Sequence, residues 1–298
     1  MSKYLKLKYL LTWILFLIMY FLTKLPFSLQ IAIGKQFGNL LKIILKSRAK
    51  IALINIKKCF PEKKENEISN LLGAHFKALG IGVIEMANCF YASNKKIKKL
   101  YTLKGRDNLE KALNSKKPVL LVLGHFTPML IAGRMLNQNY KIADVYFKAK
   151  NELFQKIMVS RFIAYGARMV DNQDMRDMIR AMKENYPLWY TPDQDYGANP
   201  SVFAPFFNIQ TATTTATARL AKITDAIVIP FSYYRDNKNH YQLTLHKPLK
   251  DYPTNDDEKN AGITNKILET DILKVPEQYL WIHKRFKTRP NNEPSFYE

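Results

Sequence analysis

The residues best placed for chemistry lie around His125, in the segment PVLLVLGHFTPMLIAGRML (118–136). Five consecutive apolar residues predict a buried strand, and the residues after the histidine predict a helix with Thr127 as N-cap and Pro128 as its first residue. A histidine between the carboxyl end of a strand and a helix lies where open α/β sheets bind their ligands. A histidine base needs an orienting group, and the position one helical turn on, where a carboxylate would serve, is Leu130.

A second polar cluster follows another apolar stretch, in WYTPDQDYGANPSVFAPFFN (189–208), and contains Asp193, Asp195 and Tyr196. Two carboxylates after a strand are suited to bind a metal, a substrate hydroxyl or an arginine, and the alternative is a polar loop with Asx turns. The next segment, TATTTATARLAK (211–222), predicts a helix start whose free N–H groups could hold an anion. Its alternative is a small-residue helix that packs closely on the sheet.

The other histidines and the cysteines are expected to have structural rather than chemical roles. His75 lies in a helical run, His240 and His246 in a predicted edge hairpin, and His283 in a predicted basic helix near the C-terminus. Cys59 and Cys89 form no C-x-x-C pair, so a disulfide framework or a zinc site is not expected, and both are expected to be reduced.

Several common catalytic motifs are missing from the sequence. It contains no phosphate-binding G-x-x-x-x-G-K-[ST], no G-x-G-x-x-G after a strand and no G-x-S-x-G nucleophile elbow. We therefore expect no metal and no cofactor.

Charge and composition restrict the partners. The chain has 298 residues, of which 47% are hydrophobic, and this suffices for one large domain or two small ones. Its formal net charge of +21 predicts an anionic partner, which could be nucleic acid, an acidic carrier protein or a membrane surface. Nucleic acid is disfavoured because the sequence has an apolar N-terminus and no nucleic-acid-binding motif.

The N-terminus favours the membrane. Lysines flank an uncharged stretch of 15 residues, 9–23, which is shorter than the roughly 20 residues needed to span a bilayer. Because no cleavage site for a signal peptide follows, we expect residues 1–25 to be a retained membrane anchor, either spanning or half-inserted. The larger excess of lysine lies after this segment and favours a cytoplasmic body.

Residues 26–60 predict a basic amphipathic helix that could lie on anionic lipid or simply expose a solvated face. A further helix is expected from the segment 61–69 to about Tyr91. The apolar face of the first helix carries Phe37, Leu41 and Ile44, and its basic stripe carries Lys42, Lys46 and Lys50.

Strands and helices alternate from Tyr101 onward, which predicts an α/β layered domain with a largely parallel central sheet flanked by helices. We therefore divide the chain into an anchor helix (1–25), a helical basic membrane-proximal region (26–100) and an α/β domain (101–298). The expected strands are 102–105, 118–124, 141–147, 167–171, 187–192, 226–234 and 241–246, and the expected helices are 106–115, 128–138, 150–164, 172–185, 211–223, 257–274 and a final one in 276–287.

These motifs together resemble the bacterial late acyltransferases of lipid A biosynthesis, the lauroyl and myristoyl transferases, which are similar to lysophospholipid acyltransferases. The resemblance rests on the strand followed by GHF, on WYTPDQDYG, SVFAPFF and ATTTATARLA, and on the tail PEQYLWIHKRFKTRP. It implies an inner-membrane enzyme with a cytoplasmic site that moves an acyl chain from acyl carrier protein to a hydroxyl of a phosphorylated glycolipid of the Kdo2-lipid IV(A) type.

The resemblance also implies a catalytic motif, H-x-x-x-x-[DE], in which the acid orients the histidine. On this sequence the histidine falls on His125, but the acid position falls on Leu130. An arginine of the family pattern falls on Phe147, and Lys148 or Lys150 could supply only a point charge in its place.

Three explanations for Leu130 stay open at this level. Asp193 or Asp195 could orient His125 instead; the chain could be a relative that binds lipid without catalysis; or Leu130 could be an engineered inactivating change. For a competent site we expect His125 as the base, Asp193, Asp195 and Tyr196 as support for it or for the substrate, and Arg168 as a phosphate or thioester contact.

Overall fold

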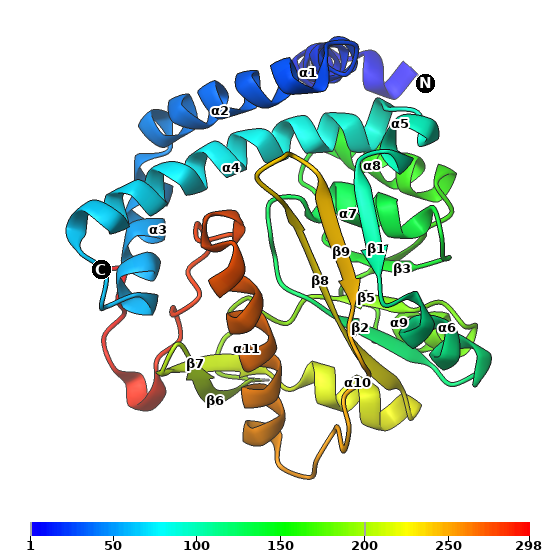
Figure 1. Cartoon of the computed structure of the whole chain (residues 1–298), viewed down its shortest axis with the longest axis vertical. Coiled ribbons are helices and arrows are strands. Elements are labelled where there is room, and N and C mark those ends of the chain that lie inside the picture. The colour runs from blue at the N-terminus through cyan, green and yellow to red at the C-terminus, as the bar shows by residue number, and fades with distance from the viewer. Residues whose placement is uncertain (1, 200) are drawn as a thin grey trace.

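The computed structural model describes residues 2–199 and 201–298. The α/β part is built on a seven-stranded sheet, and a separate two-stranded sheet lies beside it (Figure 1). The strands are β1 (Tyr101–Lys104), β2 (Val119–Val122), β3 (Ala143–Tyr146), β4 (Arg168–Asp171), β5 (Leu188–Tyr190), β6 (Ser201–Phe206), β7 (Ile209–Thr214), β8 (Ile227–Arg235) and β9 (Tyr241–Leu245). The helices are α1 (Leu10–Leu22), α2 (Phe27–Ile44), α3 (Lys46–Cys59), α4 (Glu65–Tyr91), α5 (Asn94–Lys98), α6 (Arg106–Asn114), α7 (Met129–Asn137), α8 (Glu152–Ala164), α9 (Met175–Lys183), α10 (Ala216–Thr224) and α11 (Asp257–Lys274).

The large sheet has the strand order β1-β9-β8-β2-β5-β3-β4. Pairing is parallel from β8 through β2, β5 and β3 to β4, and antiparallel between β8 and β9. The expected α/β class with a largely parallel sheet is thus confirmed. Because β2 and β5 are parallel neighbours, the segments that follow them leave the sheet at the same edge.

The two faces of the sheet are covered by different helices, as the alternation of side chains along β2 requires. Val119 and Leu121 belong to a core that includes residues of α4, α7 and α11, whereas Leu120 and Val122 belong to a core with residues of α9 and α10. Every residue of β2 is buried, so the strand that leads to His125 is held from both sides.

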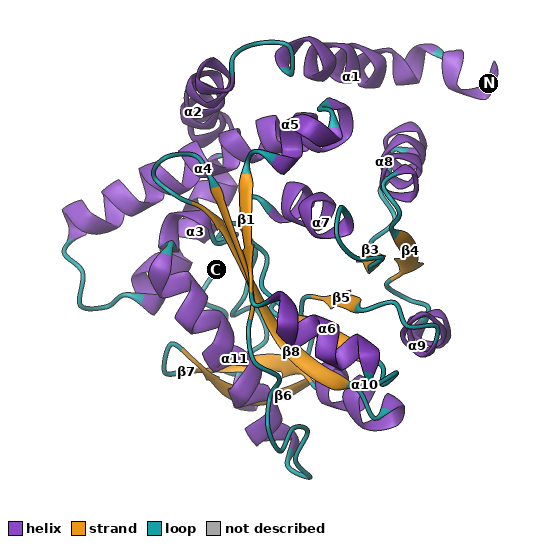
Figure 2. Cartoon of the chain, turned by 45° about the vertical axis from the view of Figure 1, so that its right-hand side comes forward, coloured by secondary structure: helices purple, strands orange, loops and turns teal. Residues whose placement is uncertain are grey.

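The N-terminal helices lie along one side of the molecule, with α1 and α2 outermost and α4 beneath them (Figures 1 and 2). Helix α4 is tied to the α/β part by Arg134 of α7, which is 1% exposed and donates to the carbonyl oxygens of Asn88, Cys89 and Ala92. Arg134 therefore caps the C-terminal end of α4, where the Asn88 carbonyl oxygen also accepts from the N–H of Ala92 at 3.0 Å.

Helix α1 has 13 residues and exposes most of its apolar side chains. It packs on the protein through a narrow side that includes Phe16 and Met19, while Leu11 is 80% and Leu17 56% exposed. Within residues 2–199 and 201–298, none of the helices combines the length and the apolar character that a membrane span requires. The spanning form of the predicted anchor therefore has no support in this fold.

Several predicted elements differ from the structure. The single helix expected over 26–60 is two helices that separate at Leu45, which divides the predicted lysine stripe between α2 and α3. The helix after His125 begins at Met129 with Pro128 as N-cap and without a side-chain cap, so the capping role of Thr127 was wrong.

The helices predicted at 211–223 and 276–287 also differ from the structure. Residues 211–214 form the end of β7 in the β6–β7 hairpin, so α10 begins only at Ala216, because the threonines pair as a strand before the helix starts. Residues 276–287 contain a short 3-10 helix (Pro276–Gln278) followed by turns. The β8–β9 hairpin was expected at a sheet edge, but β1 covers β9.

Candidate functional site

His125 lies just beyond the end of β2 and its side chain is almost buried. The residue is 8% exposed, and its backbone is held on both sides: its carbonyl oxygen accepts from the N–H of Leu280 at 2.9 Å, and its own N–H donates to Asp193 Oδ2 at 2.9 Å. A backbone fixed by two hydrogen bonds restricts where the imidazole can point.

Asp193 is the carboxylate that meets this imidazole. It follows β5, the parallel neighbour of β2, and its Oδ1 lies 2.6 Å from Nδ1 of His125. Asp193 is 2% exposed, and burial opposes its ionisation. The charge of His125 and the two hydrogen bonds from it outweigh burial and lower the pKa of Asp193 to about 2.

The pairing determines which nitrogen of His125 can act as a base. Because an ionised carboxylate only accepts hydrogen bonds, Nδ1 of the neutral imidazole carries the proton and Nε2 keeps its lone pair. Thr191 Oγ1 lies 3.4 Å from Nε2, and both residues line a cavity of about 220 Å³. A hydroxyl in this cavity could therefore be deprotonated by Nε2 while Asp193 stabilises the imidazolium.

Leu130 is the second residue of α7 and lines the same cavity as His125. Its side chain has no group that could orient an imidazole, and the orienting contact is supplied by Asp193 instead. Of the three explanations for Leu130, the geometry favours the first: the carboxylate comes from a neighbouring strand rather than from the helix. Phe147, at the family's arginine position, also lines this cavity.

Asp195 contacts different residues from Asp193, although the two are only two positions apart in the chain. Its carboxylate accepts from the backbone N–H and hydroxyl of Thr288 at 2.7 and 2.8 Å, and from the N–H of Gly197 at 2.9 Å. It therefore holds the C-terminal segment against the 193–197 loop and does not touch His125. Tyr196 lines the cavity with His125, and burial, followed by the charge of Asp193, raises its pKa to about 12.

Arg168 does not reach this site. It is the first residue of β4 and is in register with Ala143 at the start of β3, so it lies at the opposite end of the strands from His125. Its guanidinium is paired with Glu184 and with Asp177, the latter at 2.7 Å. Lys148 is similarly engaged, with Nζ 2.6 Å from Asp171. The predicted contact of Arg168 with a phosphate or thioester at the His125 site does not fit this geometry.

The C-terminal segment was missed as part of the site. Phe126 and Tyr279 form an antiparallel bridge, and the N–H of Thr127 donates to the carbonyl oxygen of Gln278 at 2.8 Å. The His283 ring centroid lies 6.1 Å from that of His125, and burial lowers the pKa of His283. The tail motif PEQYLWIHKRFKTRP supported the family resemblance, but it was not assigned to the site.

His75 and the two cysteines behave as expected for structural residues. His75 is fully buried in α4, its Nδ1 lies 3.1 Å from the carbonyl oxygen of Glu277, and burial lowers its pKa to about 4. Cys59 and Cys89 are free and buried.

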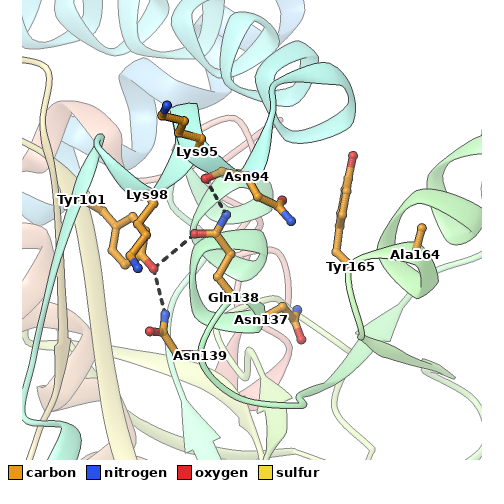
Figure 3. Close-up of a pocket in the computed structure, with 9 residues that line it drawn as sticks. All are labelled: Asn94, Lys95, Lys98, Tyr101, Asn137, Gln138, Asn139, Ala164 and Tyr165. Carbon is orange, nitrogen blue, oxygen red and sulfur yellow. Dashed lines mark hydrogen bonds between the residues drawn. The ribbon is translucent and has the colours of Figure 1, made fainter.

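A larger, polar cavity of about 510 Å³ lies between α5 and the ends of α7 and α8 (Figure 3). The dashed hydrogen bonds join Tyr101 to Gln138 and Asn139, and Gln138 to the carbonyl oxygen of Asn94, so these polar groups already have partners in the cavity wall. None of the predicted site residues lines this cavity, and none of its lining residues lines the cavity at His125.

A histidine paired with a buried carboxylate at the carboxyl edge of an α/β sheet, next to a cavity, is an arrangement that suits general-base catalysis. The chain matches the model of the bacterial lipid A biosynthesis acyltransferases over residues 1–288, and it belongs to this family.

Its relatives carry out related transfers. The chain is 33% identical over 293 residues to the lipid A biosynthesis lauroyltransferase of Escherichia coli K12, covering 97% of this chain and 95% of the relative. It is 31% identical over 292 residues to the palmitoleoyltransferase of the same organism, with the same coverage, and 30% identical over 251 residues to its myristoyltransferase, covering 83% of this chain and 78% of the relative.

Proposed function

We propose that this chain transfers a fatty acyl group from an acyl carrier protein thioester to a hydroxyl of a phosphorylated glycolipid of the Kdo2-lipid IV(A) type, with His125 as general base. Family membership and the names of the relatives support acyl transfer in lipid A biosynthesis. The observation that carries the catalytic part is the pair of hydrogen bonds between His125 and Asp193.

In the proposed reaction, Nε2 of His125 removes the proton from the acceptor hydroxyl while its oxygen attacks the thioester carbonyl. Asp193 keeps Nδ1 protonated and stabilises the imidazolium that forms. The carbon–sulfur bond then breaks, the ester is released, and the thiolate of the carrier takes the proton from Nε2. Each step uses groups of this chain and the two substrates, so no cofactor enters it.

We also propose that the enzyme works on the cytoplasmic face of the inner membrane, with α1 half-inserted in the lipid. Exposed apolar side chains cover most of α1, and the net charge of +21 suits anionic lipids, the phosphates of the acceptor and an acidic carrier protein.

Membrane binding should depend on the apolar surface of α1. Replacing Leu11 and Leu17 together by Glu is expected to weaken binding to vesicles containing anionic phospholipid on the order of 10²-fold, because each exposed leucine contributes about 1.5 kcal/mol or more when buried. Leu273→Glu, at a leucine that is 60% exposed on α11, is the matched control and should bind like the parent. Equal sedimentation of all three proteins with vesicles would contradict the proposal.

Acyl transfer itself is tested with the purified chain, acyl carrier protein thioesters and the glycolipid acceptor in detergent. We expect the parent chain to be active and Leu130→Glu to give no gain, because Asp193 already orients His125 and a glutamate would place a charge in an apolar cavity. A gain of tenfold or more in Leu130→Glu would show that the helix position is needed after all. Acceptor binding without turnover in both proteins would instead identify a catalytically impaired relative that retains lipid binding.

A further inference from the structure

Helix α8 has a cavity on a face that takes no part in the site at His125. This cavity of about 410 Å³ lies between α8, α1 and the N-terminal 3-10 helix (Ser2–Leu5). The α8 residues that line it recur at helical spacing and therefore share one face of the helix. They are Leu153, Lys156, Ile157, Ser160, Arg161 and Ala164. Met158, which lines the cavity at His125, lies on a different face of α8.

The cavity beside α1 adjoins the polar cavity of about 510 Å³ at the C-terminal end of α8. Ala164, the last residue of α8, lines both cavities, and Tyr165 lines the polar one. Figure 3 shows Ala164 and Tyr165 on one side of the polar cavity and the amides of Asn94 and Gln138 on the other. The two cavities together form one region with two chemically different parts.

The part beside α1 has mostly apolar and aromatic walls, to which Leu5, Trp13 and Ile157 contribute. The other part is walled by amide side chains. Each amide has two N–H donors and an oxygen with two lone pairs, so the hydrogen bonds within the wall leave capacity for a ligand. An apolar space joined to a polar one suits an amphipathic molecule whose headgroup carries hydroxyl groups.

Positive charge without a carboxylate partner lies where the two parts meet. The guanidinium carbon of Arg161 lies 5.1 Å from the ring centroid of Tyr91, and that of Arg134 lies 4.0 Å from the ring centroid of Tyr165. In the part of the chain that the structure describes, no carboxylate forms an ion pair with either arginine. Burial lowers the pKa of Arg134, and the charge of Arg161 lowers it further. An anion at this junction would offset the repulsion between the two charges.

Lysines of α5 add to the positive charge around the polar cavity. Lys95 and Lys98 line it and are exposed. Lys96 Nζ donates to the carbonyl oxygen of Thr23 at 3.0 Å, which joins α5 to the residue that follows α1. The polar cavity therefore lies beside the end of the helix that exposes its apolar side chains. Basic residues at such a place attract anionic lipid.

We infer that the two adjoining cavities bind one molecule of an anionic phospholipid, with its phosphate at Arg161, its hydroxylated headgroup against the amides and an acyl chain against Trp13. This site goes beyond the proposed function, and it shares no lining residue with the cavity at His125. The glycolipid acceptor fits it poorly, because its reacting hydroxyl must lie at His125. Asn137 of the polar cavity lies at the opposite end of α7, which is roughly 13 Å long.

The test is lipid binding to the full chain in neutral detergent, followed by native mass spectrometry. We expect one molecule of phosphatidylglycerol per chain, and an affinity for phosphatidylcholine that is at least tenfold lower. Arg161→Gln should weaken phosphatidylglycerol binding tenfold or more, because a charge-assisted contact with the phosphate is lost. Ala164→Phe should weaken it as well, because the ring would fill the junction of the two cavities. Both positions are exposed, so neither change disturbs the core.

Arg176→Gln is the matched control, since Arg176 is an exposed arginine on α9, and this variant should bind like the parent. Equal phosphatidylglycerol affinity of the parent and Arg161→Gln, or equal affinity of the parent for the two phospholipids, would overturn the inference. Glycerol 3-phosphate supplies a similar headgroup without acyl chains. If it displaces phosphatidylglycerol at equal concentration, the site takes a soluble phosphate ester and not a lipid. Displacement by equimolar glycolipid acceptor would assign the site to the acceptor and also reject the inference.

Discussion

Asp193→Asn is expected to lower kcat for acyl transfer by about 10³–10⁴-fold, by analogy with removal of the orienting carboxylate in serine proteases. The two oxygens of Asp193 each accept from a donor of His125, one from the backbone N–H and one from Nδ1. An asparagine has only one oxygen. Because the backbone N–H can only donate, that oxygen will face it, and the amide NH₂ will face Nδ1. Nδ1 must then be the acceptor, so Nε2 carries the proton and cannot remove one from the substrate.

The measurement is kcat and KM of purified Asp193→Asn with acyl carrier protein thioester and glycolipid. The expected signature is a loss in kcat with little change in KM, because the variant keeps the size and fold of the site. Asp195→Asn is the matched control: it is the same change at a carboxylate that contacts Thr288 and Gly197, and it should lose less than about tenfold. Retention of more than a tenth of parent activity in Asp193→Asn would mean that Asp193 does not orient the base.

Asp193 should also make the free energy of unfolding depend on pH in the acid range. Its pKa is lowered from 3.8 to about 2 in the folded protein, so the unfolded chain binds more protons between these values. The stabilisation is complete above about pH 4 and is lost as the pH falls toward 2. Asp193→Asn should remove this part of the acid dependence, which acid titration of unfolding in the two proteins measures.

Gly80→Ala should cause a large loss of stability, about 3 kcal/mol in the free energy of unfolding. Gly80 on α4 faces Gly34 and Gly38 on α2, and all three lack the side chain that would hold the helices apart. A Cβ on Gly80 would overlap the carbonyl oxygen of Gly34 and the nitrogen of Gly38 and would lie 2.6 Å from the Gly38 Cα. Backbone atoms cannot rotate away, so the helices must separate.

Gly73→Ala, seven residues earlier on α4, provides the comparison. A Cβ there meets no atom within 4 Å, so alanine should stabilise the helix by up to about 1 kcal/mol. In chemical denaturation, the free energy of unfolding should therefore be lower than that of the parent for Gly80→Ala and higher for Gly73→Ala. Equal stability of Gly80→Ala and Gly73→Ala would mean that the close approach of α2 and α4 is not needed.

Local patterns in the sequence were sufficient for most elements of the α/β part. The strand before His125 is a run of apolar residues between a proline and a glycine, and such a run is typical of a strand buried on both faces. The predictions failed where local preference and tertiary pairing disagreed. The threonines of 211–214 pair with β6 as a strand. The tail after Pro276 hydrogen-bonds to the His125 loop and folds in turns instead of forming a helix.

The sequence by itself determined that a histidine follows one buried strand, that two aspartates follow another, and to which family these motifs belong. Only the tertiary structure decided which carboxylate contacts the imidazole of the histidine. His125 and Asp193 are 68 residues apart, and they meet because β2 and β5 pair directly although β3 and β4 lie between them in the chain. Strand order depends on how the whole sheet buries its two faces, and that information does not reside in any short segment. The carboxylate that contacts His125 therefore comes from Asp193, after a neighbouring strand, and not from α7.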